Sequence, residues 1–130
     1  MFKIINPEGW KKAKGYSNGI LTEDGVLYMG GQIGWNSHQI FEDFTFIGQM
    51  EQILHNILAI VYEAGGEVKN IVRLTWYIKD KTDYLANQKN IGKIYQKVMG
   101  KHFPAMTVVI VRDLIEDEAI LEIEAMAIIK

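Results

Sequence analysis

The chain has 130 residues, of which 48% are hydrophobic and 23% charged, with a formal net charge of −2. These values are typical of one folded globular domain, so we treat residues 1–130 as a single domain. With no basic excess, a nucleic-acid partner is not expected. The chain has no cysteine, which excludes disulfides and cysteine metal sites and fits a reducing cytoplasm. No apolar run reaches the roughly 20 residues of a membrane-spanning helix, so no membrane partner is expected.

The first third of the chain predicts a short hairpin. Residues 1–15 have no periodic pattern and are expected to be irregular. Two β-type runs follow, at 20–22 and 26–29, and the Asp24-Gly25 pair between them is typical of a hairpin turn. Residues 30–34 contain three glycines, which allow unusual backbone angles and the close approach of another group.

Two helices are predicted, separated by a strand. Residues 46–61 carry apolar side chains at spacings of three and four, which predicts an amphipathic helix capped by Asp43 or Thr45. Residues 71–78, rich in β-branched and aromatic side chains, predict a strand. A second helix is expected over 84–99. Gly92 lies inside it, where glycine costs about 1 kcal/mol relative to alanine, so close packing, a nearby ligand or simple tolerance are all considered.

Two strands are expected at the end of the chain, over 106–111 and 119–129. Pro104 precedes the first, at a position where a missing backbone N–H does not disturb the strand ladder. The predicted order is ββαβαββ. This order indicates an α+β fold, in which a mixed sheet carries both helices on one face.

Two glutamates interrupt the apolar final strand. Strand alternation places Glu122 and Glu124 on one face with Met126, whereas the opposite face is wholly apolar and should pack on the helices. The glutamate face is either open to water, as for ordinary surface carboxylates, or covered by another subunit. A carboxylate on a covered face is desolvated, so its pKa rises and it can hold or activate water.

The three histidines give weaker signals. His38, His55 and His102 show no metal-ligand spacing with acidic residues, so no metal site is expected. The glycine run at 30–34 lacks the Lys-Ser/Thr ending of a phosphate-binding loop, although its backbone N–H groups could line a pocket.

Six short segments together carry a family pattern: Tyr16-Ser17, Gly31-Gln32-Ile33, Ala64-Gly65-Gly66, Val72 to Asp80, Phe103-Pro104-Ala105 and Leu121-Glu122-Ile123-Glu124-Ala125. In their order and spacing the chain resembles the RidA/YjgF family, also called the L-PSP or enamine/imine deaminase family. The resemblance implies a chorismate-mutase-like fold and a homotrimer with clefts at the subunit interfaces. It also implies a small-molecule substrate, hydrolysis of reactive enamines and imines in those clefts, and no cofactor or metal.

The resemblance assigns roles to particular residues. Tyr16 matches the cleft tyrosine, Gly31 the glycine beside the cleft backbone, and Glu122 the glutamate that positions the attacking water. Trp35 and Phe103 are candidate cleft walls, although either could belong to the core.

Three positions depart from the family pattern. Met106 stands where the family has the arginine that binds the substrate carboxylate. Gly30 stands where a serine is common in the family, and Gly92 stands where the family has an asparagine in the second helix. Methionine offers none of the charge-assisted hydrogen bonds of an arginine. The chain therefore looks like an arginine-lacking branch with a roomier, less polar cleft. Whether Arg73 or His102 takes over the role of the arginine stays open at this point.

Two functional hypotheses follow. The first is an enzyme that hydrolyses an imine or enamine, with Glu122 positioning water. The alternative is a non-catalytic, small-ligand-binding or regulatory trimer, which the replacement of the arginine by Met106 favours. A third interpretation, an endoribonuclease, comes from older descriptions of some relatives and has no support in the charge of the chain.

Overall fold

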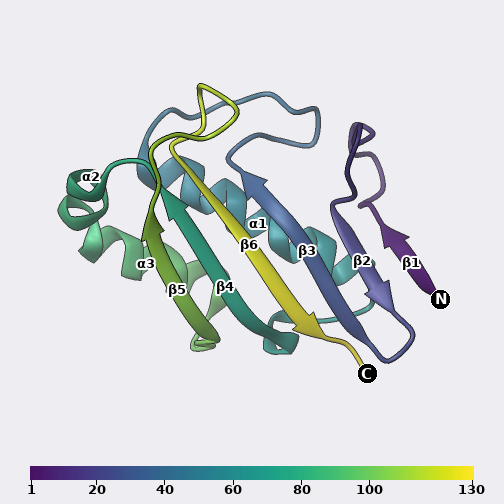
Figure 1. Cartoon of the computed structure of the whole chain (residues 1–130). Coiled ribbons are helices and arrows are strands. Elements are labelled where there is room, and N and C mark those ends of the chain that lie inside the picture. Colours follow the sequence, from purple (N-terminus) through teal and green to yellow (C-terminus); the bar gives the residue numbers. More distant parts are fainter.

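The computed structural model describes residues 1–130, which fold into one sheet covered by helices (Figure 1). The strands are β1 (Phe2–Ile5), β2 (Gly19–Thr22), β3 (Val26–Ile33), β4 (Ile71–Ile78), β5 (Ala105–Ile110) and β6 (Leu121–Ile128). The helices are α1 (Phe46–Glu63), α2 (Lys81–Ala86) and α3 (Gln88–Met99), with a 3₁₀ turn, η1 (Val68–Asn70), before β4.

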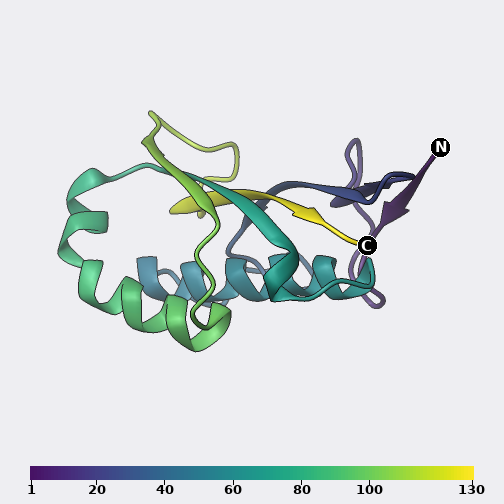
Figure 2. The ribbon, with the colours of Figure 1, turned by 90° about the horizontal axis from the view of Figure 1, so that it is seen from below.

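The six strands lie in the order β1-β2-β3-β6-β4-β5. All neighbours are antiparallel except β4 and β5, which run parallel because the chain crosses between them through α2 and α3. Figure 2 shows the helices on one side of the sheet and the other face free of them. The predicted mixed sheet with its helices on one face is confirmed.

Two local predictions were wrong. The stretch expected to be irregular contains β1, which pairs with β2 from Phe2 opposite Thr22 to Ile5 opposite Gly19. Three of its four side chains are exposed, so β1 has no alternation of buried and exposed residues from which a strand could be predicted. Its hydrogen-bonded pairing with β2 makes it a strand. The expected second helix is also interrupted at Asn87, which ends α2 and precedes α3. The Asn87 side chain donates to the Asp83 carbonyl at 2.7 Å, a local bond that competes with helix continuation.

The core lies between α1 and the helix-facing side of the sheet. Alternate residues of β4 and β6 are buried there: Leu74, Trp76, Ile78, Leu121, Ile123, Ala125 and Ala127. Thr45 is the N-cap of α1, because its hydroxyl accepts the Gly48 amide at 3.0 Å. The alternating burial of β6 places Glu122 and Glu124 on the open face of the sheet, as predicted.

The buried Gln49 of α1 holds the chain just before β6. Its side-chain amide donates to the Glu118 carbonyl at 2.9 Å, and its Oε1 atom accepts the Ile120 amide at 2.8 Å. A buried polar side chain with these partners is satisfied rather than costly. The starting point of β6, and with it the position of Glu122, is therefore fixed from the helix side.

Gly92 of α3 is not a close-packing position. A β-carbon added there would have no atom within 4 Å outside its own helix turn and chain neighbours. We expect Gly92→Ala to raise the free energy of unfolding by about 0.5–1 kcal/mol, the helix-propensity difference between the two residues. Urea unfolding followed by tryptophan fluorescence measures this change, and a loss of stability would show that the glycine has a packing role after all.

Candidate functional site

The face of the sheet that carries no helices, here called the open face, presents polar side chains of β4 and β6. Thr75 lies opposite Glu124, and Tyr77 lies opposite Glu122, in the antiparallel pairing of these strands. The Tyr77 hydroxyl donates a hydrogen bond to the Glu124 carboxylate. That bond, together with desolvation, raises the pKa of Tyr77, so its hydroxyl keeps its proton. Glu124 is thus engaged by a neighbouring side chain.

A cavity of about 370 Å³, here called the glutamate cavity, lies at the end of β3 on this face. Tyr16, Gly30, Gly31, Trp35 and Glu122 all line it. Five of the residues selected from the sequence are therefore brought together, although they come from separate segments of the chain. Such a concave site with a few polar groups suits a small molecule.

Gly31 and Glu122 fit against each other in this cavity. A β-carbon at position 31 would overlap the carboxyl group of Glu122. Gly31 does not have a positive φ angle, so it provides space rather than an unusual backbone angle. The sequence predicted that the glycines of residues 30–34 allow unusual backbone angles and the close approach of another group. Gly31 allows the close approach, because its missing side chain leaves room for the Glu122 carboxyl group.

Glu122 has a perturbed carboxyl group. Desolvation by burial, the larger cause, and the nearby charge of Glu124 both raise its pKa above the ordinary value for glutamic acid. A carboxyl group with a raised pKa beside a cavity is better placed to exchange a proton near neutral pH than a fully solvated one. The direction of this pKa shift is the one predicted for a covered glutamate, whereas the activation of water by Glu122 stays a prediction.

We expect Gly31→Ala to displace the Glu122 carboxylate and to reduce any activity that depends on it about 100-fold or more, the range typical of a misplaced general base. Gly30→Ala is the matched control. A β-carbon there would lie 3.3 Å from the Ser17 carbonyl oxygen, which a small shift relieves. Steady-state kinetics of both variants measures the difference, and equal activities would argue against the fit between Gly31 and Glu122.

The remaining selected residues line a different cavity. Gly92, Phe103 and Met106 lie around a space of about 230 Å³, here called the aromatic cavity, together with Trp76 and Tyr95. Phe103 is 65% exposed and stacks on Tyr95 at a centroid distance of 5.7 Å. Phe103 is therefore a wall and not part of the core. The indole N–H of the buried Trp76 has no hydrogen-bond acceptor.

The two cavities lie on opposite faces of the sheet. Met106 pairs with Leu74, whose side chain is buried toward the helices, whereas Glu122 pairs with Tyr77 on the open face. Paired residues of neighbouring strands point to the same side. Within one copy of the chain, Met106 and Glu122 therefore cannot face the same ligand.

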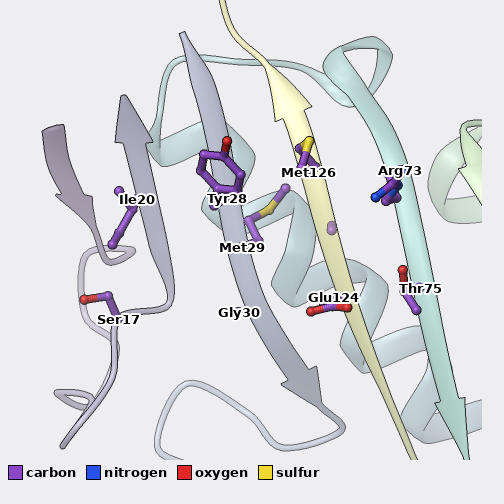
Figure 3. Close-up of a pocket in the computed structure, with 10 residues that line it drawn as sticks. Ser17, Ile20, Tyr28, Met29, Gly30, Arg73, Thr75, Glu124 and Met126 are labelled. Carbon is purple, nitrogen blue, oxygen red and sulfur yellow. The ribbon is translucent and has the colours of Figure 1, made fainter. Parts of the chain in front are cut away.

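Neither of the proposed arginine substitutes joins Met106. Figure 3 shows Arg73 on β4 with Glu124 and Met126 of β6, around a third cavity of about 350 Å³ on the open face. Arg73 lies four residues from Tyr77, about 13 Å along the strand from the level of Glu122. His102 uses its Nε2 atom to bond the Ile71 carbonyl at 2.7 Å.

Several residues of the glutamate cavity were not predicted from the sequence. Ile115, which is 98% exposed, and Glu116 reach it from the segment before β6. Behind it, the buried Gln32 donates to the Asn18 side chain at 3.2 Å. Gln39 has a φ of 62° and donates to the Tyr16 hydroxyl at 3.4 Å. Ile115, Glu116 and Gln39 have no periodic or spacing signal, because loops bring them to the site. Gln32 belongs to β3 and to the family segment Gly31-Gln32-Ile33, but its hydrogen bond to Asn18 could not be predicted from the sequence.

Comparison with known proteins identifies the family. The family model described as Endoribonuclease L-PSP matches residues 8–129, so the chain belongs to this family, which includes the RidA, YjgF and RutC proteins. The RutC family protein PM1466 of Pasteurella multocida is 32% identical over 128 residues, 98% of each chain. The fold and the sequence together thus confirm the resemblance.

Solved structures agree over nearly the whole chain. The Rid family protein YyfA of Yersinia pestis has a TM-score of 0.85 and 30% identity, covering 99% of this chain and all of that one. TdcF of E. coli, solved with bound serine, has a TM-score of 0.83 and 27% identity, covering 98% and 99%.

The structure also bears on two other features, a metal site and a membrane-spanning helix. No group of three or more His, Asp and Glu side chains is arranged to hold a metal ion. None of the helices combines the length and the hydrophobicity that crossing a membrane requires.

Proposed function

We propose that this protein hydrolyses a small imine or enamine in the glutamate cavity. The single observation that carries the proposal is Glu122, a half-buried carboxyl group with a raised pKa that lines a 370 Å³ cavity beside Tyr16 and the Gly31 backbone. The similar TdcF, whose structure holds serine, belongs to the same family and supports a small metabolite as ligand.

In the proposed reaction Glu122 acts as the general base. The Glu122 carboxylate takes a proton from water as the water oxygen forms a bond to the imine carbon. That proton passes from Glu122 to the nitrogen and gives a carbinolamine. Glu122 then takes the proton of the new hydroxyl group and returns it to the nitrogen, so that the carbon–nitrogen bond breaks, ammonia leaves and a carbonyl compound remains. Tyr16 supplies a hydroxyl donor at the same cavity. A positioned carboxylate of this kind typically accelerates a reaction by about 10²–10⁴-fold.

We also propose that the working unit is the homotrimer that the family resemblance implies. Since the glutamate and aromatic cavities lie on opposite faces of one copy, only a second copy can bring them into one cleft. The edge strand β5 supports such an assembly, because all six of its side chains are exposed and Val108, Val109 and Ile110 are apolar. An exposed apolar edge strand is a favourable place for contact with another chain.

We expect Ile110→Lys to dissociate the trimer, because the charge would be buried at the interface without a partner. Light scattering should then give the monomer mass of 14.9 kDa. Tyr62→Lys is the control, since Tyr62 is 56% exposed on α1, away from β5. A wild-type protein that is already a monomer would contradict the assembly.

The proposed activity is tested by ammonia release. Purified protein is added to imines generated in solution, and the rate is compared with spontaneous hydrolysis. Acceleration is expected. The alternative, a non-catalytic ligand-binding trimer, remains the second candidate because Met106 replaces the family arginine. It would be favoured by a small molecule that raises the melting temperature in a metabolite screen while no imine is turned over.

A further inference from the structure

We infer that the substrate is an imine or enamine that carries an apolar, preferably aromatic, group and no carboxylate. This inference rests on the proposed function, because it specifies the substrate class of the same cleft. It is drawn from the charges of the two cavities and from the walls of the aromatic cavity.

The charges disfavour an anionic substrate. No Lys, Arg or His side chain lines the glutamate cavity or the aromatic cavity. The glutamate cavity instead contains two carboxyl groups, those of Glu116 and Glu122. A substrate carboxylate would meet like charges and no cation, whereas a neutral imine meets no such repulsion and its protonated form is attracted.

The two cationic side chains considered as substitutes for the family arginine have other positions. The His102 ring is bonded to the backbone of β4, and Arg73 lies on the open face, opposite to the side on which Met106 points. A flexible methionine adapts its shape to an apolar ligand. The position where the family binds a carboxylate is therefore apolar in this chain, and no cationic side chain of the same copy lines the aromatic cavity around it.

The aromatic cavity has the form of an aromatic-ring site. Its volume of about 230 Å³ exceeds the roughly 150 Å³ of a protein cavity that holds benzene. Phe103, Tyr95 and Trp76 offer ring faces and edges against which another ring packs well. The Trp76 indole N–H is buried without an acceptor, which is costly unless a ligand atom or π face accepts it.

A matched pair of imines tests the inference. A monoamine oxidase converts 2-phenylethylamine to phenylacetaldimine, and an amino-acid oxidase converts phenylalanine to 2-imino-3-phenylpropanoate, so the two imines differ by one carboxylate. Hydrolysis of each is measured as ammonia release above the spontaneous rate. We expect kcat/KM for the neutral imine to be at least about tenfold higher, the factor that 1.4 kcal/mol of transition-state preference supplies.

The outcomes separate the two proposals. Equal rates, or preference for the carboxylate-bearing imine, would overturn the inference and leave the imine hydrolase proposal standing. No acceleration of any imine, including small carboxylate-bearing ones, would overturn both.

A variant tests the aromatic cavity itself. Because Phe103 is largely exposed, Phe103→Ala is expected to fold, which circular dichroism checks. We expect it to lower kcat/KM for phenylacetaldimine several-fold more than for the imine derived from ethylamine. An equal loss for both substrates would show that no aromatic group binds there.

Discussion

Glu122→Gln is expected to lower kcat for imine hydrolysis by about 10²–10⁴-fold, the contribution of a positioned general base. Glutamine keeps the size of the side chain and its place over Gly31, but it cannot take a proton from water. The ammonia-release assay measures the loss. Glu118→Gln is the matched control, since Glu118 is exposed and does not line the glutamate cavity.

The pH dependence gives an independent check on the same residue. Because the active form of Glu122 is the carboxylate, the rate should fall as the pH decreases through the raised pKa of this group. The charge of Glu124 contributes to that raised pKa, so Glu124→Gln should move the acidic limb of the pH–rate profile to lower pH. A limb that stays in place would mean that another group controls the profile.

Glu122→Gln should also change stability, in the direction opposite to activity. A carboxyl group whose pKa is raised in the folded protein is ionised more readily in the unfolded chain, so its contribution to stability decreases as the pH rises through the interval between the two pKa values. The glutamine variant should therefore melt higher than wild type at pH 7, with a smaller difference in acid. Thermal melts at both pH values measure this.

If the proposed imine hydrolysis holds, Met106→Arg is expected to shift the substrate preference toward carboxylate-bearing imines. Hydrogen bonds to charged groups contribute about 1.5–3 kcal/mol, which corresponds to a gain of roughly 10- to 150-fold in kcat/KM for 2-imino-3-phenylpropanoate. Met106 is 44% exposed, so an arginine can be placed there without burying its charge completely. The measurement is the ratio of kcat/KM for the two matched imines.

Two controls accompany Met106→Arg. Met106→Leu keeps the site apolar and should leave the preference for the neutral imine intact. Met106→Lys adds the charge without the two-pronged geometry of the guanidinium group and should give a smaller gain. If arginine, lysine and leucine give the same ratio, position 106 does not contact the part of the substrate that carries the carboxylate.

The sequence by itself determined most of the element types, though not β1 or the break between α2 and α3, and the face assignment of β6. The alternation of apolar residues in β6 requires one side to be buried, so Glu122 and Glu124 had to share the other side. Local propensity likewise determined α1 and the hairpin of β2 and β3, whereas the structure decided between Asp43 and Thr45 as the N-cap of α1. These features depend on neighbours in the chain, which a sequence displays directly.

The tertiary structure alone decided how the candidate residues are grouped. Tyr16, Gly31, Trp35 and Glu122 meet only because β3 pairs with β6 and the segments before β2 and after β3 lie at that end of the sheet. Strand order and register, which no local pattern encodes, place Met106 on the face opposite Glu122. The pairing of β4 with β5 sets Arg73 opposite Ala105 and Leu74 opposite Met106, so the side chains of Arg73 and Met106 point to opposite faces of the sheet.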